Sequence, residues 1–177
     1  FGRVGTFSFY FSHHMTTLEG GMTIARNKRD AELMRILRAH GWIREVEDRQ
    51  PWIDRYPDIH PRFLFVNLGY NLRATELQGA MGLVQLPKLS DYVKTRRENA
   101  EWFGQHFAKH ADHLHCQTET PEGAHSWFGF PITIAESTLF GVEDIMTALG
   151  ANGIETRPII CGNIARQPGL KMYPHRV

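Results

Sequence analysis

The sequence predicts an α/β chain of short strands and amphipathic helices. Residues 4–10 are a run of β-branched and aromatic side chains, which is typical of a strand. Residues 88–109 repeat apolar side chains at helical spacing, over a length that is enough to connect two domains. Strand-like and helical stretches then alternate, as in a small α+β domain. Strands are expected there at 113–116, 127–134 and 153–157. A helix is expected at 142–150.

The first forty residues predict two strands and a helix. A polar elbow separates the strand at 4–10 from a second strand at 22–25. Asn27 is a suitable N-cap for a helix that runs to about His40, and Gly41 is a suitable stop after it. The apolar stripe of this helix holds Leu33, Ile36 and Leu37. His40 takes the next position of that stripe, so we expect it to point inward.

The middle of the chain predicts an ordered surface loop and two helices. Residues 43–65 combine many aromatic side chains and prolines with alternating charges, as ordered loops do. Thr75 and Gln78 have the spacing of a capping box, which predicts a helix start. Pro87 should end this helix and begin the one at 88–109. The buried face of the first helix is expected to hold Leu77, Ala80, Met81 and Val84. That of the second is expected to hold Leu89, Val93, Ala100, Phe103 and Phe107.

The composition narrows the class of protein. The chain has 177 residues and a formal net charge of +1, so neither charge sign accumulates. We therefore expect no nucleic-acid partner and no membrane-surface partner. No apolar run approaches the roughly 20 residues that a membrane helix needs. Cys116 and Cys161 lie far apart and form no CxxC pair, which fits a reduced, cytoplasmic compartment.

Two adjacent histidines, His13 and His14, lie in the elbow between the first two strands. Gly20 and Gly21 close the elbow, and glycine permits a positive φ or a close approach of the backbone to a ligand. The alternative is a tight turn with histidines on the surface, because a turn glycine needs no ligand. Composition alone favours this simple turn.

A second histidine-rich stretch follows the long helix. Its side chains suit zinc, and they are His106, His110, His113, His115 and Cys116. Phe103 and Phe107 set the packed face of that helix, so these histidines should lie at its edge or in solvent. No zinc-finger spacing is matched. We therefore predict a solvated helix end and no metal site.

A third stretch, residues 68–73, stands just before the helix that begins near Thr75. Gly69 marks a bend, and Asn71 and Arg73 follow it. Anions are favoured at a helix N-terminus, which makes these two residues candidates for binding one. Ordinary helix-entry chemistry is the alternative, and the residues alone favour it.

In this order and spacing, several stretches of the chain resemble the DegT-like nucleotide-sugar aminotransferases. These are fold type I enzymes, with the aspartate-aminotransferase fold, that use pyridoxal 5′-phosphate (PLP). The stretches are Gly5-Thr-Phe-Ser-Phe, Glu19-Gly-Gly-Met, Leu37-Arg-Ala-His-Gly-Trp, Gly69-Tyr-Asn-Leu-Arg-Ala-Thr-Glu-Leu-Gln, Gln85-Leu-Pro-Lys-Leu, Gly153-Ile-Glu-Thr-Arg-Pro-Ile and Gly162-Asn-Ile-Ala-Arg-Gln-Pro. The resemblance therefore covers nearly the whole chain.

The resemblance implies how the chain is divided. Residues 1–105 would be the C-terminal part of the large PLP-binding domain with its bridging helix. Residues 106–177 would be an incomplete small C-terminal domain. Family chains are roughly twice this length, so we expect an internal fragment. The aspartate that pairs with the cofactor's pyridine nitrogen would lie upstream.

Aligned on the first strand, His13 stands where aminotransferases of this family carry the lysine that bonds covalently to PLP. Ser8, five residues earlier, matches the family serine that contacts the cofactor phosphate. An imidazole forms no stable covalent link of that kind, but its unperturbed pKa of ~6.5 suits a general base. The resemblance therefore implies that PLP, or its amine form pyridoxamine 5′-phosphate (PMP), is held without a covalent tether.

The same exchange is found in the sugar 3-dehydratases of the family. The resemblance to these dehydratases implies C-3 deoxygenation of a 4-keto-6-deoxy nucleotide sugar that is used for lipopolysaccharide O-antigen. In that reaction His13 would be the general base and L-glutamate the amine donor. Residues 43–65 contain no cysteine, so the iron–sulfur type of dehydratase is not expected. Two alternatives stay open: an ordinary nucleotide-sugar aminotransferase, and a non-catalytic descendant of the family.

The resemblance also gives roles to four further residues. His14 would support His13 at the cofactor. His40 would line the same pocket, and a hydrogen-bonded core histidine is the equal alternative. Asn71 matches the family asparagine that contacts the cofactor phosphate of the neighbouring subunit, which implies a homodimer with shared active sites. Arg73 would face that interface or the nucleotide of the substrate.

Overall fold

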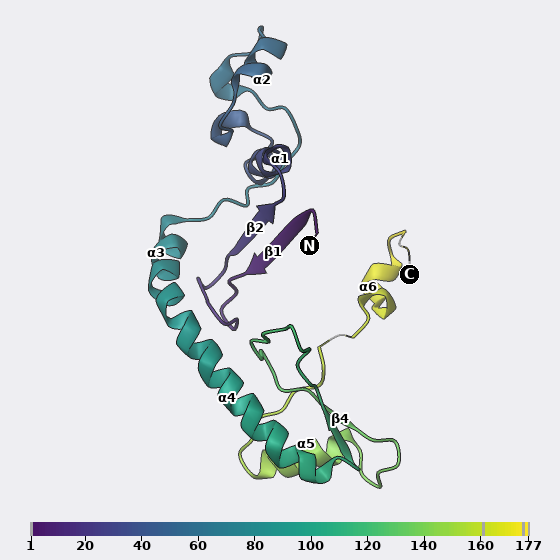
Figure 1. Ribbon diagram of the computed structural model, residues 1–177. Coiled ribbons are helices and arrows are strands. Elements are labelled where there is room, and N and C mark those ends of the chain that lie inside the picture. The colour runs from purple at the N-terminus through teal and green to yellow at the C-terminus, as the bar shows by residue number, and fades with distance from the viewer. Residues whose placement is uncertain (1, 161, 175, 177) are drawn as a thin grey trace. The chain divides into compact units, whose positions relative to one another are not determined.

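The computed structural model describes residues 2–160, 162–174 and 176. The chain forms two compact units, residues 1–93 and residues 94–177. The division falls within the long helix α4 (Leu89–Phe107), which is drawn in teal in Figure 1. The domain boundary expected at residue 105 lies nearer the end of the same helix, and it stays a prediction.

Unit 1 begins with an antiparallel hairpin. Strand β1 (Val4–Ser8) pairs with β2 (Gly21–Ala25), and Ser8 lies opposite Gly21. Both predicted strands are confirmed, although β1 ends two residues earlier than expected. The β-branched and aromatic content of the first strand argues for burial, but Phe7 in β1 is 50% exposed; Ile24 in β2 is 51% exposed. A two-stranded ribbon has two open faces, and burial depends on what packs against them.

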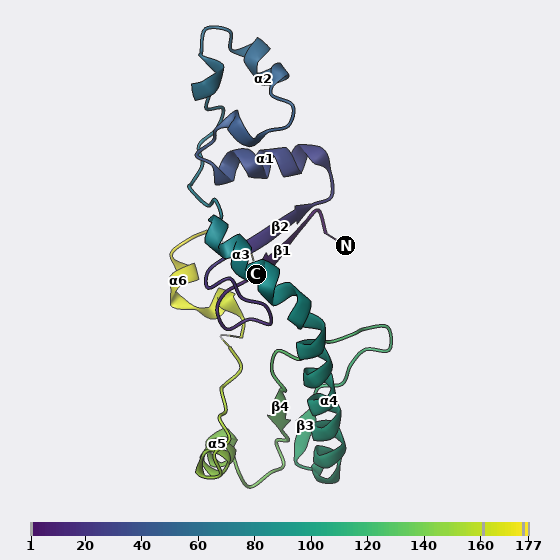
Figure 2. The same ribbon diagram turned by 90° about the vertical axis from the view of Figure 1, so that its left-hand side faces the viewer.

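Helix α1 (Lys28–Arg38) lies between the hairpin and α2 (Gln50–Arg55) (Figure 1). Asn27 caps it as predicted, because its side-chain oxygen accepts a hydrogen bond of 2.9 Å from the Asp30 amide. Figure 2 shows α1 across the end of the hairpin at which β2 finishes. Ile36 is buried, as the apolar stripe predicts.

The prediction that His40 points inward is wrong. Helix α1 ends at Arg38, and the chain then turns through positive φ at His40 (63°) and Gly41 (86°). Because His40 lies beyond the last helical residue, helical periodicity no longer sets the direction of its side chain. The residue is exposed. The other two stripe residues, Leu33 and Leu37, are exposed as well.

The buried core of unit 1 comes mainly from residues 43–65. This stretch contains the short 3-10 turns η1 (Ile43–Glu45) and η2 (Pro61–Phe63) on either side of α2. It is ordered, as predicted, and most of its residues are exposed, but it is more than a surface loop. It supplies three of the four side chains of the apolar core cluster, which are Ile36, Ile43, Val46 and Leu64. Trp52, Ile53, Tyr56 and Val66 pack around that cluster.

Helix α3 (Glu76–Gln85) begins with the predicted capping box: the Thr75 side chain accepts from the Gln78 amide, and the Gln78 side chain accepts from the Thr75 amide. The expected buried face of α3 is wrong, since Leu77 and Val84 are 66% and 59% exposed. The predicted break at Pro87 is confirmed by the turn η3 (Leu86–Lys88), after which α4 begins. Within α4, Ala100 is buried, whereas Phe103 is exposed.

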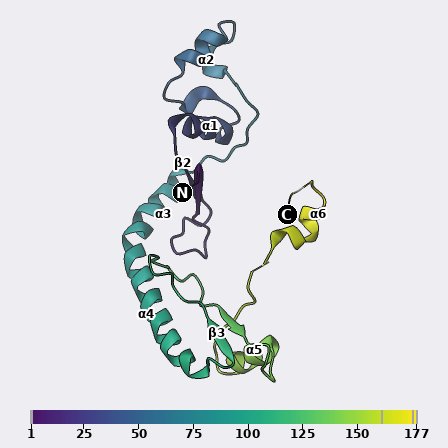
Figure 3. The same ribbon diagram turned by 45° about the vertical axis from the view of Figure 1, so that its right-hand side comes forward.

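Unit 2 is a small two-stranded sheet between two helices. Strand β3 (Leu114–Cys116) pairs antiparallel with β4 (Ile132–Ile134). The pair lies between the C-terminal part of α4 and α5 (Val142–Ala151), as Figures 2 and 3 show. The turn η4 (Ala108–His110) joins α4 to β3.

Two predictions for unit 2 need correction. The strand expected at 127–134 is confirmed only over β4, its last three residues. The strand expected at 153–157 is absent from the described structure. The chain leaves α5 through Gly153 at φ 76° and continues without regular secondary structure or a ladder partner there. Short elements η5 (Ile164–Arg166) and α6 (Pro168–Lys171) follow.

No helix in the described part of the chain combines the length and the apolar composition that crossing a bilayer requires. Cys116 is a partly buried free thiol. Cys161 lies outside the described residues.

Candidate functional site

The elbow between β1 and β2, residues 9–20, is closed by backbone hydrogen bonds. The Phe9 amide donates to the Gly20 carbonyl and the Thr17 amide donates to the Phe9 carbonyl, both at 2.9 Å. Thr17 is buried, and its hydroxyl donates to the Glu19 carbonyl at 3.0 Å. The elbow therefore has a fixed base, although half of its residues are exposed.

His13 is half-buried in this elbow and lies close to the end of β1. Its amide donates to the Tyr10 carbonyl at 3.0 Å, and its ring meets the Tyr10 ring edge-on. Its Nδ1 lies 3.4 Å from the Ser8 carbonyl oxygen. A proton on Nδ1 would be donated to that carbonyl, which leaves Nε2 as the basic nitrogen.

Ser8 and His14 complete the predicted elbow group. Ser8 is exposed, and its hydroxyl oxygen accepts a hydrogen bond of 3.3 Å from the Tyr10 amide. His14 is half-buried beside His13. The structure thus places the His13 ring beside the Ser8 backbone carbonyl. The cofactor roles of Ser8, His13 and His14 stay predictions.

The second group of predicted site residues lies on the segment that precedes α3. The turn after α1 pairs with this segment: the His40 amide donates to the Tyr70 carbonyl at 3.0 Å, and Ala39 and Asn71 form an isolated bridge. Arg73 Nε donates to Asn71 Oδ1 at 2.9 Å. Asn71, Arg73 and His40 are all exposed and are held through the backbone.

Glycines make this backbone pairing possible. A Cβ at Gly69 would lie 2.6 Å from the Gly41 nitrogen and would overlap the Leu37 carbonyl oxygen. A Cβ at Gly41 would overlap the Asn67 carbonyl. Only glycine permits two backbone segments of the chain to approach this closely. The sequence placed a bend at Gly69, but the contact with Gly41 joins segments that are far apart in the chain.

The histidine-rich stretch runs from the end of α4 through η4 into β3. Within the ranges that the structure describes, no group of three histidine, cysteine, aspartate or glutamate side chains is placed to hold a metal ion. The His106 ring stacks on Trp102, and its Nδ1 lies 2.7 Å from the Trp102 carbonyl oxygen.

Sequence reasoning missed an arginine-lined cavity in unit 1. Its volume is about 440 Å³, and it is lined by Trp42, Arg44, Arg49, Ile53, Pro61 and Arg62. The Arg44 guanidinium lies 5.1 Å from the centre of the Trp42 ring. Guanidinium groups bind phosphate well. The sequence feature that could have indicated this cavity is the set of arginines spread through residues 43–65. They alternate with acidic residues in the sequence, but three of them line one cavity.

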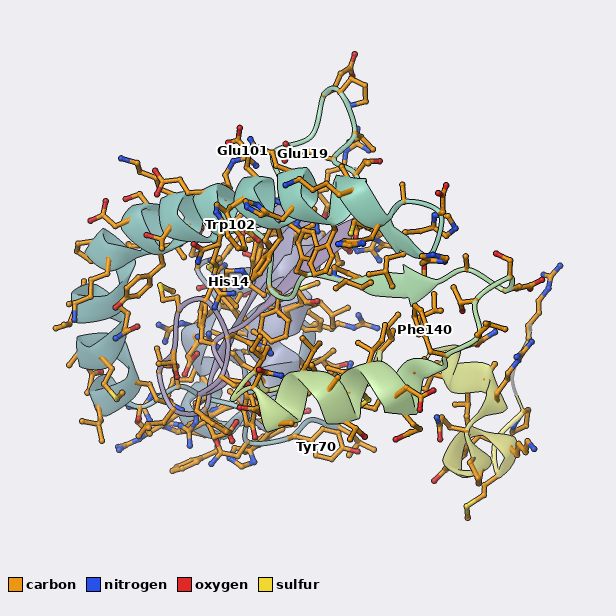
Figure 4. All side chains as sticks on the ribbon, turned by 90° about the horizontal axis from the view of Figure 1, so that it is seen from below. His14, Tyr70, Glu101, Trp102, Glu119 and Phe140 are labelled. Atoms are coloured by element: carbon orange, nitrogen blue, oxygen red, sulfur yellow. The ribbon has the colours of Figure 1, made fainter. Side chains whose placement is uncertain are left out.

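A second feature that the sequence did not reveal is the ion pair between Arg97 on α4 and Glu119. Figure 4 labels Glu119 beside α4. Two Arg97 nitrogens donate to the Glu119 carboxylate at 2.6 and 2.9 Å, and the His125 amide donates to it as well. The hydrogen bond from Arg97, with that from His125, lowers the pKa of Glu119 to about 2. Arg96 donates to the carbonyls of Trp127 and Phe128. These contacts fasten the loop before β4 to α4.

A family match covers almost the whole chain. The DegT/DnrJ/EryC1/StrS aminotransferase family matches residues 1–175, which confirms the resemblance seen in the sequence. The chain is similar to GDP-4-keto-6-deoxy-D-mannose 3-dehydratase of Yersinia pseudotuberculosis, with 38% identity over 183 residues, covering 100% of this chain and 45% of the relative. It is also similar to the protein of that name from Escherichia coli O55:H7, with 36% identity over 175 residues, covering 98% and 44%.

One similar solved structure is GDP-4-keto-6-deoxymannose-3-dehydratase with a trapped PLP-glutamate geminal diamine. Its TM-score is 0.84 at 34% identity, covering 98% of this chain and 45% of that one. This similarity confirms an α/β fold shared with aminotransferase-family structures. The chain spans less than half the length of the curated relatives that it matches.

Proposed function

Because the chain belongs to the DegT/DnrJ/EryC1/StrS aminotransferase family, we propose that it forms part of a PLP/PMP-dependent sugar 3-dehydratase. The reaction would be C-3 deoxygenation of a 4-keto-6-deoxy nucleotide sugar. The names of the two relatives support GDP-4-keto-6-deoxymannose as the substrate. The observation that carries the proposal is His13, an imidazole at the elbow position where aminotransferases of the family carry lysine.

The residues of the elbow fit a phosphate-bearing cofactor held without a covalent bond. The Ser8 hydroxyl lies on the exposed end of β1, and Gly20 and Gly21 are exposed where the elbow closes. Hydroxyl and amide groups suit a phosphate. When bound, PLP or PMP supplies the exchangeable amino group and an electron sink.

His13 is proposed as the general base and acid. The Ser8 carbonyl near Nδ1 favours the tautomer in which Nε2 takes and returns a proton. The contact with the Tyr10 ring helps to hold the imidazole in one orientation. His14 would support the orientation of the elbow from the next position in the chain. His40 is proposed to line the cofactor pocket from the exposed turn after α1.

The nucleotide of the substrate requires cationic groups for its diphosphate. Arg73 is proposed for this role or for the subunit interface, because it is exposed and already hydrogen-bonded to Asn71. The arginine-lined cavity offers Arg44, Arg49 and Arg62 as further groups of the same kind.

A homodimer is part of the proposal. Asn71 would reach the cofactor phosphate of the neighbouring subunit. Around it, Leu68, Tyr70 and Leu72 are exposed by 91%, 78% and 71%, and exposed apolar side chains of this kind favour a protein interface. L-glutamate is proposed as amine donor, supported by the ligand named in the similar solved structure. We propose a cytoplasmic location, residues 1–105 as part of the large domain, and residues 106–177 as part of the small domain.

The test uses the full-length protein with PLP, L-glutamate and GDP-4-keto-6-deoxymannose, and identifies the product by mass spectrometry. We expect a sugar without its C-3 oxygen, together with released ammonia. His13→Lys should abolish this product, whereas His14→Asn, a change at the next position, should retain part of the activity.

Two other results would contradict the proposal. A 4-amino sugar as the product of the unaltered protein would identify an aminotransferase instead. Full dehydration by His13→Lys would show that His13 is not the base.

A further inference from the structure

The side-chain amide of Gln78 makes hydrogen bonds through both its oxygen and its nitrogen. Gln78, at the third position of α3, accepts a hydrogen bond through Oε1 from the Thr75 amide at 2.7 Å. Its Nε2 donates to the Glu19 carbonyl at 2.5 Å. Glu19 lies 59 residues earlier in the chain, at the closing end of the elbow. The two contacts therefore join segments that are distant in sequence.

Both ends of this link carry predicted site residues. On one side, the Glu19 carbonyl also accepts from the Thr17 hydroxyl, and Thr17 closes the elbow that carries His13. On the other side, Thr75 follows directly after the segment with Asn71 and Arg73. The packing agrees with the link, because a Cβ at Gly82 of α3 would lie 3.5 Å from the Thr17 methyl group.

Helix capping explains only half of what Gln78 does. Glutamate serves as well as glutamine at this position of a capping box, and a negative charge in the first turn is favoured by the helix dipole. A carboxylate cannot donate a hydrogen bond, however. The bond from Nε2 to the Glu19 carbonyl is therefore a contact that capping does not require and that an amide provides.

We propose that Gln78 is a positioning residue that holds the His13 elbow at a set distance from the entry of α3. The proposal rests on the proposed function, because it concerns how the base is placed relative to Asn71 and Arg73. Loss of the Nε2 bond would loosen the elbow while the capping box keeps α3 intact.

The decisive variant is Gln78→Glu, which keeps the acceptor for the Thr75 amide and removes the donor to Glu19. Gln78→Ala removes both, and Gln105→Glu makes the same chemical change on the exposed surface of α4. The readouts are amide hydrogen exchange of the full-length protein without substrate, followed by kcat and KM. Hydrogen exchange does not depend on turnover, so it tests this inference even if the proposed reaction is wrong.

For Gln78→Glu we expect about tenfold faster exchange at the Phe9 and Thr17 amides, with α3 unchanged, because a lost hydrogen bond of ordinary strength corresponds to roughly that factor. We expect kcat to fall about tenfold, by the same reasoning, and KM to change little. Gln78→Ala should loosen α3 as well, and Gln105→Glu should match the unaltered protein. Unchanged elbow exchange in Gln78→Glu would overturn the proposal. Equal loosening of the elbow and α3 in that variant would also overturn it, since Gln78 would then have only a structural role.

Discussion

The core cluster of unit 1 and the elbow are held by different forces. The four core side chains, Ile36, Ile43, Val46 and Leu64, are at most 2% exposed and pack against one another. In the elbow only Thr17 is buried, and directional hydrogen bonds hold the loop. Apolar packing resists change over a whole cluster, whereas a hydrogen-bonded loop depends on single groups.

The difference matters because the candidate base lies in the hydrogen-bonded region. A change in the core should lower the free energy of unfolding of unit 1. A change in the elbow should alter where His13 lies at a smaller cost in stability. The three predictions below test this separation, from the largest expected effect to the smallest.

Gly69→Ala should have the largest effect. The new Cβ would meet backbone atoms of Leu37 and Gly41, which cannot move aside as a flexible side chain can. Overpacking of this kind costs about 2–3 kcal/mol of unfolding free energy. Urea unfolding measures it. Gly79→Ala is the matched control, because nothing lies within 4 Å of a Cβ there.

Gly79 lies within α3, where alanine should stabilise by about 0.5–1 kcal/mol. Equal unfolding midpoints for Gly69→Ala and Gly79→Ala would contradict the close backbone contact between Gly69 and Gly41.

Thr17→Val should have an intermediate effect. The substitution keeps the shape of the side chain and removes the hydroxyl that donates to the Glu19 carbonyl. That hydrogen bond is worth about 1 kcal/mol. Amide hydrogen exchange should show the change in the elbow and leave the core cluster protected. The control is Thr23→Val on the exposed strand β2, and faster exchange in the core cluster of Thr17→Val would break the separation.

Glu119→Gln should have the smallest effect, because both partners of its ion pair are partly exposed and solvent screens them. The pKa of Glu119 in the folded protein is lowered to about 2, mainly by the Arg97 hydrogen bond. The ion pair therefore stabilises the fold above the ordinary carboxyl pKa, and this contribution is lost as pH falls from about 4.5 towards 2.

The measurement is the difference in urea midpoint between the unaltered protein and Glu119→Gln as a function of pH. The difference should shrink below pH 4.5. Glu122→Gln, an exposed position in the same loop, is the control. A difference that stays constant across this range would show that the Arg97 contact does not lower the pKa of Glu119.

Local chemistry accounts for what could be predicted along the chain. The helix starts at Asn27 and Thr75, and the break at Pro87, follow from groups that act on their nearest neighbours, and the structure confirms them. The family followed from motifs in order, and the match over residues 1–175 confirms it.

What failed were statements about burial and about partners distant in sequence. The exposed faces of β1 and α3, the outward His40, the core role of residues 43–65 and the absent strand at 153–157 all depend on what packs against a segment. The same holds for the Arg97–Glu119 ion pair and the arginine-lined cavity.

The sequence by itself determined the starts of α1 and α3, the break at Pro87 and the family, because capping and turn chemistry act within a few residues. Only the tertiary structure decided which side chains form the core, how closely Gly41 and Gly69 approach, and that Gln78 joins the elbow to α3. These contacts form between segments that meet only after the chain has folded, and no local pattern specifies them.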